Sequence, residues 1–341
     1  MTTPASPTAA AYTVVGGGAI GGTLAAHLAL AGHPVQIVDT DSAHVAAIRR
    51  QGLRIDSPTG TLQTSIPAFE LADAPDELGP VILAVKSQAT ASAMEWIGPR
   101  LRSDGFVVSM QNGLNEAAIA KRIGADRTVI AFVDLFADLL EPGVVQDGGI
   151  GTIALGEYAG DTSRRVDRLA EDLSHWGSPI VSDNVSGYLW SKLAFGAMLT
   201  ASAFIDEDMS SVISENRTPM LGLAREVFAV SDALGLQLES FDAFIPDDYR
   251  VESSDSTINA AFDSLSDWLA GQTKTRSGIW RDINVRKRPT EVTAHYQPVF
   301  AVADDQGIRT PKLHTMVELI GELERNESSM GASLMWRIEA E

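Results

Sequence analysis

Residues 12–39 read YTVVGGGAIGGTLAAHLALAGHPVQIVD, and no other segment says as much about the fold. It joins a β-branched run, the pattern Gly16-x-Gly18-x-x-Gly21, an Ala/Leu-rich helical segment and a second apolar run that ends at Asp39. Strand, glycine-rich turn, helix and strand in this order form the unit that binds dinucleotides. Glycine clusters also serve ordinary turns, but the acid at the end of the second run favours a dinucleotide site.

The residues of the turn have separate predicted tasks. Gly16 permits a sharp turn out of the strand, Gly18 lets a pyrophosphate approach the backbone, and Gly21 lets the helix pack closely on the sheet. Ala19 and Ile20 begin the helix, whose free N–H groups attract phosphate. We predict that these five residues bind the cofactor.

Asp39 predicts which cofactor is preferred. A carboxylate at the end of the second strand accepts hydrogen bonds from the ribose hydroxyls, whereas it repels a 2′-phosphate. The next residue is Thr40 and carries no positive charge. We therefore expect NAD as the preferred cofactor, with NADP as the alternative.

Composition excludes several classes of function. The 341 residues are 45% hydrophobic, enough for two cores, and the net charge of −19 opposes binding to nucleic acid or an anionic membrane. Cysteine is absent, which excludes disulfides and thiolate catalysis, and the histidines lack metal-ligand spacing. No run is long enough to span a bilayer and the first residues do not resemble a signal peptide. We expect a cytoplasmic protein without metal.

The chain changes texture once. From residue 12 to about residue 182, short β-branched runs alternate with helical stretches, which predicts an α/β fold with a Rossmann-type doubly wound sheet. Beyond Asn184, helical periodicity continues to Arg337 and predicts an all-α domain. The predicted parts are a disordered tail at 1–11, a dinucleotide-binding domain at 12–182 and a helical substrate and catalytic domain at 183–341.

Four residues outside the turn could take part in catalysis or binding. Lys86 and Asn112 each follow a buried strand, where ligands collect in open α/β sheets, although Asn112 before a glycine is also an ordinary turn residue. Lys192 lies in an apolar helical stripe, where it is either used or extends to solvent. Glu291 follows three basic residues at a helix start, a position that the helix dipole also favours.

Five motifs together resemble the ketopantoate reductase (2-dehydropantoate 2-reductase) family, within the 6-phosphogluconate dehydrogenase C-terminal-like superfamily. They are GGGAIGG at 16–22, VKSQ at 85–88, QNGLN at 111–115, LWSKL at 189–193 and KRPTE at 287–291. They fall in family order, and the resemblance covers roughly residues 12–325. It implies a dinucleotide-binding domain, a helical second domain and a small carbonyl or alcohol substrate in the cleft between them.

The resemblance also implies roles for individual residues. The lysine matching Lys192 is the general acid that protonates the carbonyl oxygen, and the glutamate matching Glu291 supports substrate binding and proton transfer. The asparagine matching Asn112 helps to hold cofactor and substrate, and Lys86 matches a lysine near the cofactor.

The sequence departs from the family at the substrate wall. Gly196 and Thr200 stand where the family usually has asparagines, which predicts a bulkier or less polar substrate. Ser277 stands beside the position of a frequent family serine, and we predict that Gly196, Thr200 and Ser277 face the substrate. Typical members also prefer NADPH, which Asp39 opposes.

We therefore predict an NAD(P)-dependent oxidoreductase that interconverts a ketone and a secondary alcohol, with Lys192 as general acid/base. We expect a homodimer. One alternative is a true 2-dehydropantoate 2-reductase that uses NADPH. The other is a non-catalytic dinucleotide-binding sensor, which would not need to retain both Lys192 and Glu291.

Overall fold

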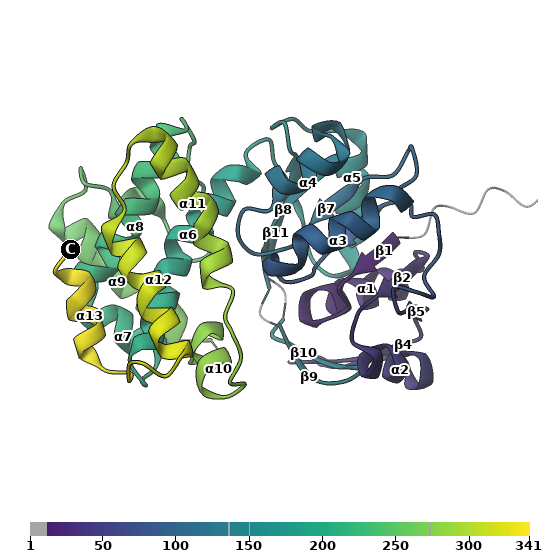
Figure 1. The fold of residues 1–341 in the computed structure, drawn as a ribbon, viewed down its shortest axis with the longest axis horizontal. Helices are drawn as coiled ribbons and strands as arrows, with labels where there is room; N and C mark the ends of the chain where they lie inside the picture. The colour runs from purple at the N-terminus through teal and green to yellow at the C-terminus, as the bar shows by residue number, and fades with distance from the viewer. Residues whose placement is uncertain (1–11, 136, 150, 273) are drawn as a thin grey trace, which may run out of the picture. The chain divides into compact units, whose positions relative to one another are not determined.

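The computed structural model describes residues 12–135, 137–149, 151–272 and 274–341, so the predicted disordered tail at 1–11 lies outside the described residues. The chain forms two compact units, the first ending at Val185 and the second beginning at Ser186. Each unit has its own architecture (Figure 1).

The first unit is built on an eight-stranded sheet with the order β12-β11-β8-β7-β6-β1-β2-β5. Every neighbouring pair is parallel except β8 and β11, which are antiparallel. The strands are β1 Tyr12–Val15, β2 Val35–Val38, β5 Ala68–Phe69, β6 Val81–Leu83, β7 Val107–Ser109, β8 Thr128–Asp134, β11 Thr152–Glu157 and β12 Ile180–Val181. The predicted Rossmann-type α/β fold is confirmed.

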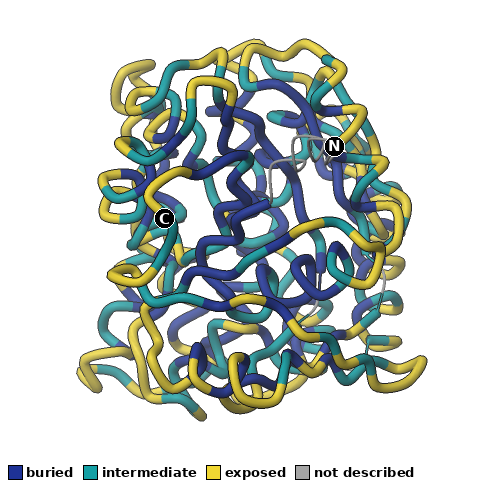
Figure 2. Tube along the Cα trace, turned by 90° about the vertical axis from the view of Figure 1, so that its right-hand side faces the viewer, coloured by how far each residue is buried: buried dark blue, intermediate teal, exposed yellow. Residues whose placement is uncertain are grey.

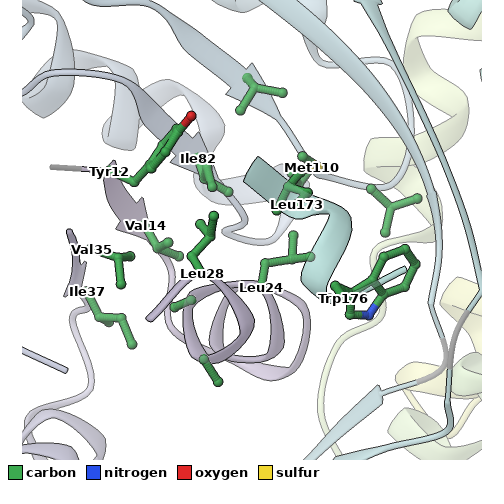
Figure 3. Close-up of a cluster of buried hydrophobic side chains, with 14 of the residues drawn as sticks. Tyr12, Val14, Leu24, Leu28, Val35, Ile37, Ile82, Met110, Leu173 and Trp176 are labelled. Carbon is green, nitrogen blue, oxygen red and sulfur yellow. The ribbon is translucent and has the colours of Figure 1, made fainter. Parts of the chain in front are cut away.

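Helices flank this sheet. They are α1 Ala19–Leu30, α2 Ser42–Gln51, α3 Thr90–Ile97, α4 Glu116–Ile123 and α5 Arg164–Asp172, with short 3₁₀ turns η1 Ser87–Ala89, η2 Gly98–Arg100, η3 Ala125–Arg127 and η4 Leu173–His175. Helix α1 buries Leu24 and Leu28 completely, beside Val14 of β1 and Trp176 after η4 (Figure 3). This packing fixes the start of α1 relative to the end of β1.

A second, four-stranded sheet with the order β4-β3-β10-β9 was not predicted from the sequence. Its strands are β3 Leu53–Ser57, β4 Gly60–Thr64, β9 Ala137–Glu141 and β10 Val144–Asp147. The strands are short and carry many exposed positions, so their apolar periodicity is weak. Parallel pairing of β3 with β10 also joins segments that are far apart in the sequence.

The second unit is helical, as predicted, and no strand element occurs in its described residues. Its elements are α6 Val185–Ala201, η5 Ser202–Phe204, α7 Met209–Glu215, α8 Arg217–Ala233, η6 Pro246–Tyr249, α9 Asp255–Ala270, α10 Gly278–Asn284, α11 Val292–Gln306, α12 Pro311–Glu324 and α13 Ala332–Glu339. The apolar stripe of α6, formed by Leu189, Leu193, Ala197 and Ala201, is buried.

Burial follows the expected pattern of a hydrophobic interior and exposed loops (Figure 2). Among the described residues, no single helix is both long and apolar enough to cross a membrane. The bent pair of segments Val185–Phe204 and Met209–Glu215 reaches that length and composition only together, across a bend of 99°.

Candidate active site

The turn after β1 requires glycine at two positions. Gly16 has a φ of 93°, and a Cβ there would lie 2.7 Å from the backbone nitrogen of Val85. A Cβ on Gly21 would lie 2.0 Å from the carbonyl oxygen of Gly16 and 2.9 Å from Cγ1 of Val14. Strand β1 and helix α1 therefore approach each other so closely that only glycine fits at these two positions.

Gly18 has a different environment. It is the N-cap of α1 with a φ of −64°, no side chain caps this helix end, and a Cβ on Gly18 would have no atom within 4 Å. The first N–H groups of α1, at Ala19, Ile20 and Gly21, lack partners within the helix. An open space beside uncapped N–H groups fits a pyrophosphate, so the residues present suit a dinucleotide.

Asp39 directly follows β2 and turns back to the glycine loop. Its Oδ2 accepts a hydrogen bond of 2.7 Å from the N–H of Gly17, and its Oδ1 accepts one of 2.9 Å from the N–H of Asp41. Because each carboxylate oxygen can accept more than one bond, these contacts orient Asp39 and leave it able to bind ribose hydroxyls.

Two more carboxylates lie near the end of β2. Asp41 caps α2 by accepting from the N–H groups of Ala43 and His44. Glu70 follows Phe69, the β5 residue that pairs with Val38 of β2. The Oε2 of Glu70 accepts a hydrogen bond of 2.8 Å from Ser42 Oγ. In the part of the chain that the structure describes, no lysine or arginine forms an ion pair with Asp39, Asp41 or Glu70. This rim is therefore electronegative.

A buried polar network joins the loops after β6 and β7. Gln111 donates hydrogen bonds of 2.9 Å to the carbonyl of Val85 and 2.8 Å to Thr90 Oγ1. Thr90 in turn donates to Asn115 Oδ1 at 3.1 Å, and Asn115 Nδ2 donates to the carbonyl of Asn112 at 2.8 Å. Sequence reasoning assigned no role to Gln111, Thr90 or Asn115, although polar residues beside buried strands were the available signal.

The network fixes the backbone beside two predicted cofactor residues. Ser87 Oγ donates a bond of 2.7 Å to the carbonyl of Asn112, which connects the two loops directly. Lys86 precedes η1 and Asn112 follows β7, and both side chains are exposed. Since β6 and β7 are parallel neighbours, Lys86 and Asn112 lie at the same edge of the sheet.

Lys192 lies in the middle of α6 and is half-buried. Trp190 on one side and Leu193 on the other are only 4% and 6% exposed, and Ser191 is fully buried. Lys192 therefore lies in a largely buried stretch of α6, which is compatible with both predicted alternatives, catalysis and extension to solvent.

Gly196 and Thr200 follow Lys192 by one and two turns of α6. A Cβ on Gly196 would have only the Tyr296 hydroxyl within 4 Å, at 3.6 Å, so this part of the helix is open. Thr200 is buried and hydrogen-bonds to Tyr296. The two positions therefore differ: one offers space, and the other is occupied by a contact within the protein.

Tyr296 connects α11 to α6. Its hydroxyl donates a hydrogen bond of 2.9 Å to the carbonyl of Leu193, so the contact with Thr200 must be donated by the threonine. Burial raises the pKa of Tyr296 and keeps it neutral. Sequence reasoning missed this residue because a tyrosine in an apolar helical pattern looks like any core aromatic.

Glu291 occupies the N-cap position of α11, where it is half-buried. The preceding residue is held firmly, since the N–H and the hydroxyl of Thr290 both donate to Glu324 Oε1 at 2.7 Å. His295 Nε2 lies 3.9 Å from Glu291 Oε1. The geometry places a carboxylate and an imidazole together at this helix start.

Ser277 is the N-cap of α10. Its Oγ accepts a bond of 3.3 Å from the N–H of Trp280, and the residue is 6% exposed. The hydroxyl proton is still available for donation, because the capping contact uses only a lone pair. Among the described residues, no group of three or more His, Cys, Asp or Glu side chains could hold a metal ion.

Family models match most of the chain. Residues 12–160 match the model "Ketopantoate reductase PanE/ApbA", and residues 184–324 match "Ketopantoate reductase PanE/ApbA C terminal". The 2-dehydropantoate 2-reductase of Mesorhizobium japonicum is 30% identical over 66% of this chain and 77% of its own length. That of Halobacterium salinarum is 27% identical over 92% of this chain and 98% of its own length.

Solved structures share the fold. A D-mandelate dehydrogenase in ternary complex with NADH and anilino(oxo)acetate has a TM-score of 0.79 at 20% identity, over 92% of this chain and 99% of that chain. A ketopantoate reductase from Staphylococcus aureus, described as dimeric, has a TM-score of 0.69 at 16% identity, over 93% and 100%.

Proposed function

Because this chain belongs to the ketopantoate reductase family and is an NAD(P)-dependent oxidoreductase acting on a ketone and its alcohol, we propose that Lys192 is its general acid/base. The observation that carries this proposal is the position of Lys192 among buried residues of α6. At this position the ammonium stands in a largely apolar stretch of the helix and can face a carbonyl oxygen.

The bound nicotinamide supplies or accepts the hydride. As a ketone is reduced, negative charge grows on its oxygen, and the ammonium of Lys192 stabilises that charge more in the transition state than in the ground state. Lys192 then gives its proton to the oxygen. In the direction of oxidation, neutral Lys192 removes the same proton from the alcohol.

Glu291 supports this proton transfer as an orienting carboxylate. The two bonds from Thr290 to Glu324 hold the start of α11, and the bond from Tyr296 to Leu193 connects α11 to the backbone beside Lys192. We assign Asn112 and Lys86 to cofactor contact, since the buried network fixes the loops that carry them.

We propose that NAD is the preferred cofactor. Asp39 is oriented by the Gly17 N–H, and the carboxylates of Asp41 and Glu70 add negative charge near the place of a 2′-phosphate. A phosphate there would face like charges, since no lysine or arginine of the described residues forms an ion pair with these three carboxylates. The D-mandelate dehydrogenase of the same fold was solved with NADH, so this fold can bind the cofactor that we propose here.

The substrate proposed is a 2-oxo acid, and its 2-hydroxy acid, with a side chain that is bulkier or less polar than that of 2-dehydropantoate. The relatives' names include one 2-oxo acid, 2-dehydropantoate itself, and one aromatic 2-hydroxy acid, mandelate. Gly196 leaves space on α6, Thr200 is engaged with Tyr296, and Ser277 offers a hydroxyl proton. True 2-dehydropantoate reduction with NADPH is the second candidate, because the curated relatives carry that name.

One experiment separates these candidates. NADH and NADPH are titrated calorimetrically, and 2-dehydropantoate and aromatic or branched 2-oxo acids are then compared as substrates of wild type and Gly196→Asn. We expect tighter NADH binding and a higher kcat/KM for a bulky substrate, which Gly196→Asn reduces. Tighter NADPH binding with preference for 2-dehydropantoate supports the second candidate, and cofactor binding without any turnover supports a sensor.

We also propose a cytoplasmic homodimer. The S. aureus ketopantoate reductase of this fold is described as dimeric, and the net charge of −19 suits a protein that stays dissolved. Light scattering of the purified full chain tests the subunit number, and cell fractionation tests the location. A monomer at micromolar concentration contradicts the dimer.

A further inference from the structure

His44 contacts both the glycine loop and the turn between β9 and β10 of the first unit. It belongs to α2, is 1% exposed, and makes a contact with each ring nitrogen. Nδ1 lies 3.0 Å from the backbone nitrogen of Gly143, and Nε2 lies 2.8 Å from the carbonyl oxygen of Gly17. Neither the family motifs nor the proposed mechanism uses this residue.

The two contacts determine the tautomer of His44. The N–H of Gly143 can only donate, so Nδ1 must accept and carries no proton. The carbonyl of Gly17 can only accept, so Nε2 must carry the proton. A neutral imidazole with its proton on Nε2 is the one form that satisfies both neighbours.

Gly17 is thereby held at both of its polar backbone groups. Its N–H donates to Asp39 Oδ2 at 2.7 Å, and its carbonyl accepts from His44. A Cβ on Gly17 would lie 2.5 Å from Cγ2 of Ile37, so the loop has no room to move toward β2. The Gly17 carbonyl and the Gly18 N–H belong to the same peptide group. Holding the carbonyl therefore fixes the orientation of the backbone at Gly18, which faces the open space at the start of α1.

The other contact of His44 reaches the second sheet. Gly143, with a φ of 83°, forms the turn between β9 and β10, and its carbonyl accepts a bond of 3.0 Å from the N–H of Arg54 at β3. One imidazole therefore connects the four-stranded sheet to the cofactor loop.

We propose that His44 is a positioning residue for the dinucleotide: its Nε2–H holds the Gly17 peptide in the orientation that receives the pyrophosphate. Pre-organised binding groups increase affinity because less conformational freedom is lost on binding. This inference requires only dinucleotide binding, which the family shares, and is independent of Lys192 and of the choice between NAD and NADP.

Two amide substitutions separate the two contacts of His44. In His44→Gln the amide nitrogen reaches the place of Nε2 and can donate to Gly17. In His44→Asn the amide oxygen takes the place of Nδ1 and can accept from Gly143, but the carbonyl of Gly17 loses its donor. His33, a partly exposed histidine of the same unit that pairs with Asp172, provides control variants His33→Gln and His33→Asn.

The readout is the Kd of the full-length protein for the tighter of NADH and NADPH, together with kcat at saturating cofactor. We expect His44→Asn to weaken binding about tenfold or more, and His44→Gln to stay within about threefold of wild type. The kcat at saturation and both His33 variants should change little. Equal losses in both His44 variants, or no loss in either, would overturn the proposal, since packing alone does not distinguish the two amides.

A second measurement does not depend on folding of the variants. ¹⁵N NMR of the imidazole in wild-type protein with cofactor reports which nitrogen carries the proton. A proton on Nε2 and none on Nδ1 is expected. A proton on Nδ1 would overturn the assignment, because that form cannot accept from Gly143.

Discussion

Tyr296 of α11 donates a hydrogen bond of 2.9 Å to the backbone carbonyl of Leu193, the residue that follows Lys192 in α6. The same hydroxyl accepts from Thr200. Glu291 precedes α11, so the helix that begins beside one proposed catalytic residue is joined to the backbone next to the other. The buried hydroxyl is a structural connection between Lys192 and Glu291.

Removing this hydroxyl should affect both stability and catalysis. Tyr296→Phe leaves the ring in place but removes the donor to Leu193, whose carbonyl still takes part in the helix, so we expect a loss of about 1 kcal/mol in stability. We also expect a lower kcat, since α11 and α6 lose a contact beside Lys192. Chemical denaturation and steady-state kinetics measure the two effects, with Tyr158→Phe of the first unit as the control. Unchanged stability and kcat together would refute this role.

Two glycines of the cofactor loop should respond differently to alanine. At Gly21 a Cβ would lie 2.0 Å from a carbonyl oxygen, whereas at Gly18 it would enter open space at an ordinary φ of −64°. Gly21→Ala should therefore destabilise the fold, and Gly18→Ala should keep its stability but bind cofactor at least about tenfold more weakly. Melting temperature and calorimetry distinguish the two results. Full cofactor affinity in a folded Gly18→Ala protein would show that the open space is not the phosphate site.

Asp39 should set the cofactor preference. In Asp39→Ala the ribose hydroxyls lose an acceptor and a 2′-phosphate loses a repelling charge, so the ratio of NADPH to NADH dissociation constants should fall by about tenfold. Asp73→Ala, a substitution of an exposed carboxylate in the same unit, should leave the ratio unchanged. A ratio equal to that of wild type would show that Asp39 does not set the cofactor preference.

Glu116 at the start of α4 should make stability depend on pH. Burial raises its pKa from 4.5 to about 6, against the opposing effect of backbone N–H groups. The folded state therefore holds this proton more tightly than the unfolded state, so stability falls as pH rises from about 4.5 to 6 and the ionised group costs about 2 kcal/mol above that interval.

Replacement of Glu116 by glutamine should remove this dependence. Relative to wild type, Glu116→Gln should gain stability between pH 4.5 and pH 7, as measured by urea midpoints, while the exposed control Glu95→Gln should show no such gain. Parallel pH profiles for wild type and Glu116→Gln would contradict the assignment.

The part of the fold that is local in sequence was predictable. The glycine spacing from Gly16 to Gly21 and the apolar run on each side contain a whole βαβ unit, so β1, α1 and β2 followed from one stretch. The buried stripe of α6 followed from four-residue spacing in the same way. Short-range patterns were sufficient because each of these elements buries its own apolar face.

Contacts between distant segments were not predictable. The bonds from Gln111 to Thr90, from Tyr296 to Leu193 and from Gly143 to His44 depend on how separate elements come together. In the sequence, each of these residues looks like an ordinary core or turn residue. The second sheet was missed for the same reason, since β3 and β10 pair across a long separation.

The kinetics of Lys192→Ala decide whether Lys192 is the general acid/base. We expect kcat to fall about 100-fold or more, the Kd for the preferred cofactor to stay within about twofold, and a small primary amine added to the assay to restore part of the lost rate. Lys121→Ala, an exposed lysine variant of the first unit, should behave as wild type. Near-normal turnover of Lys192→Ala would contradict the account, because no proton donor at this position would then be required.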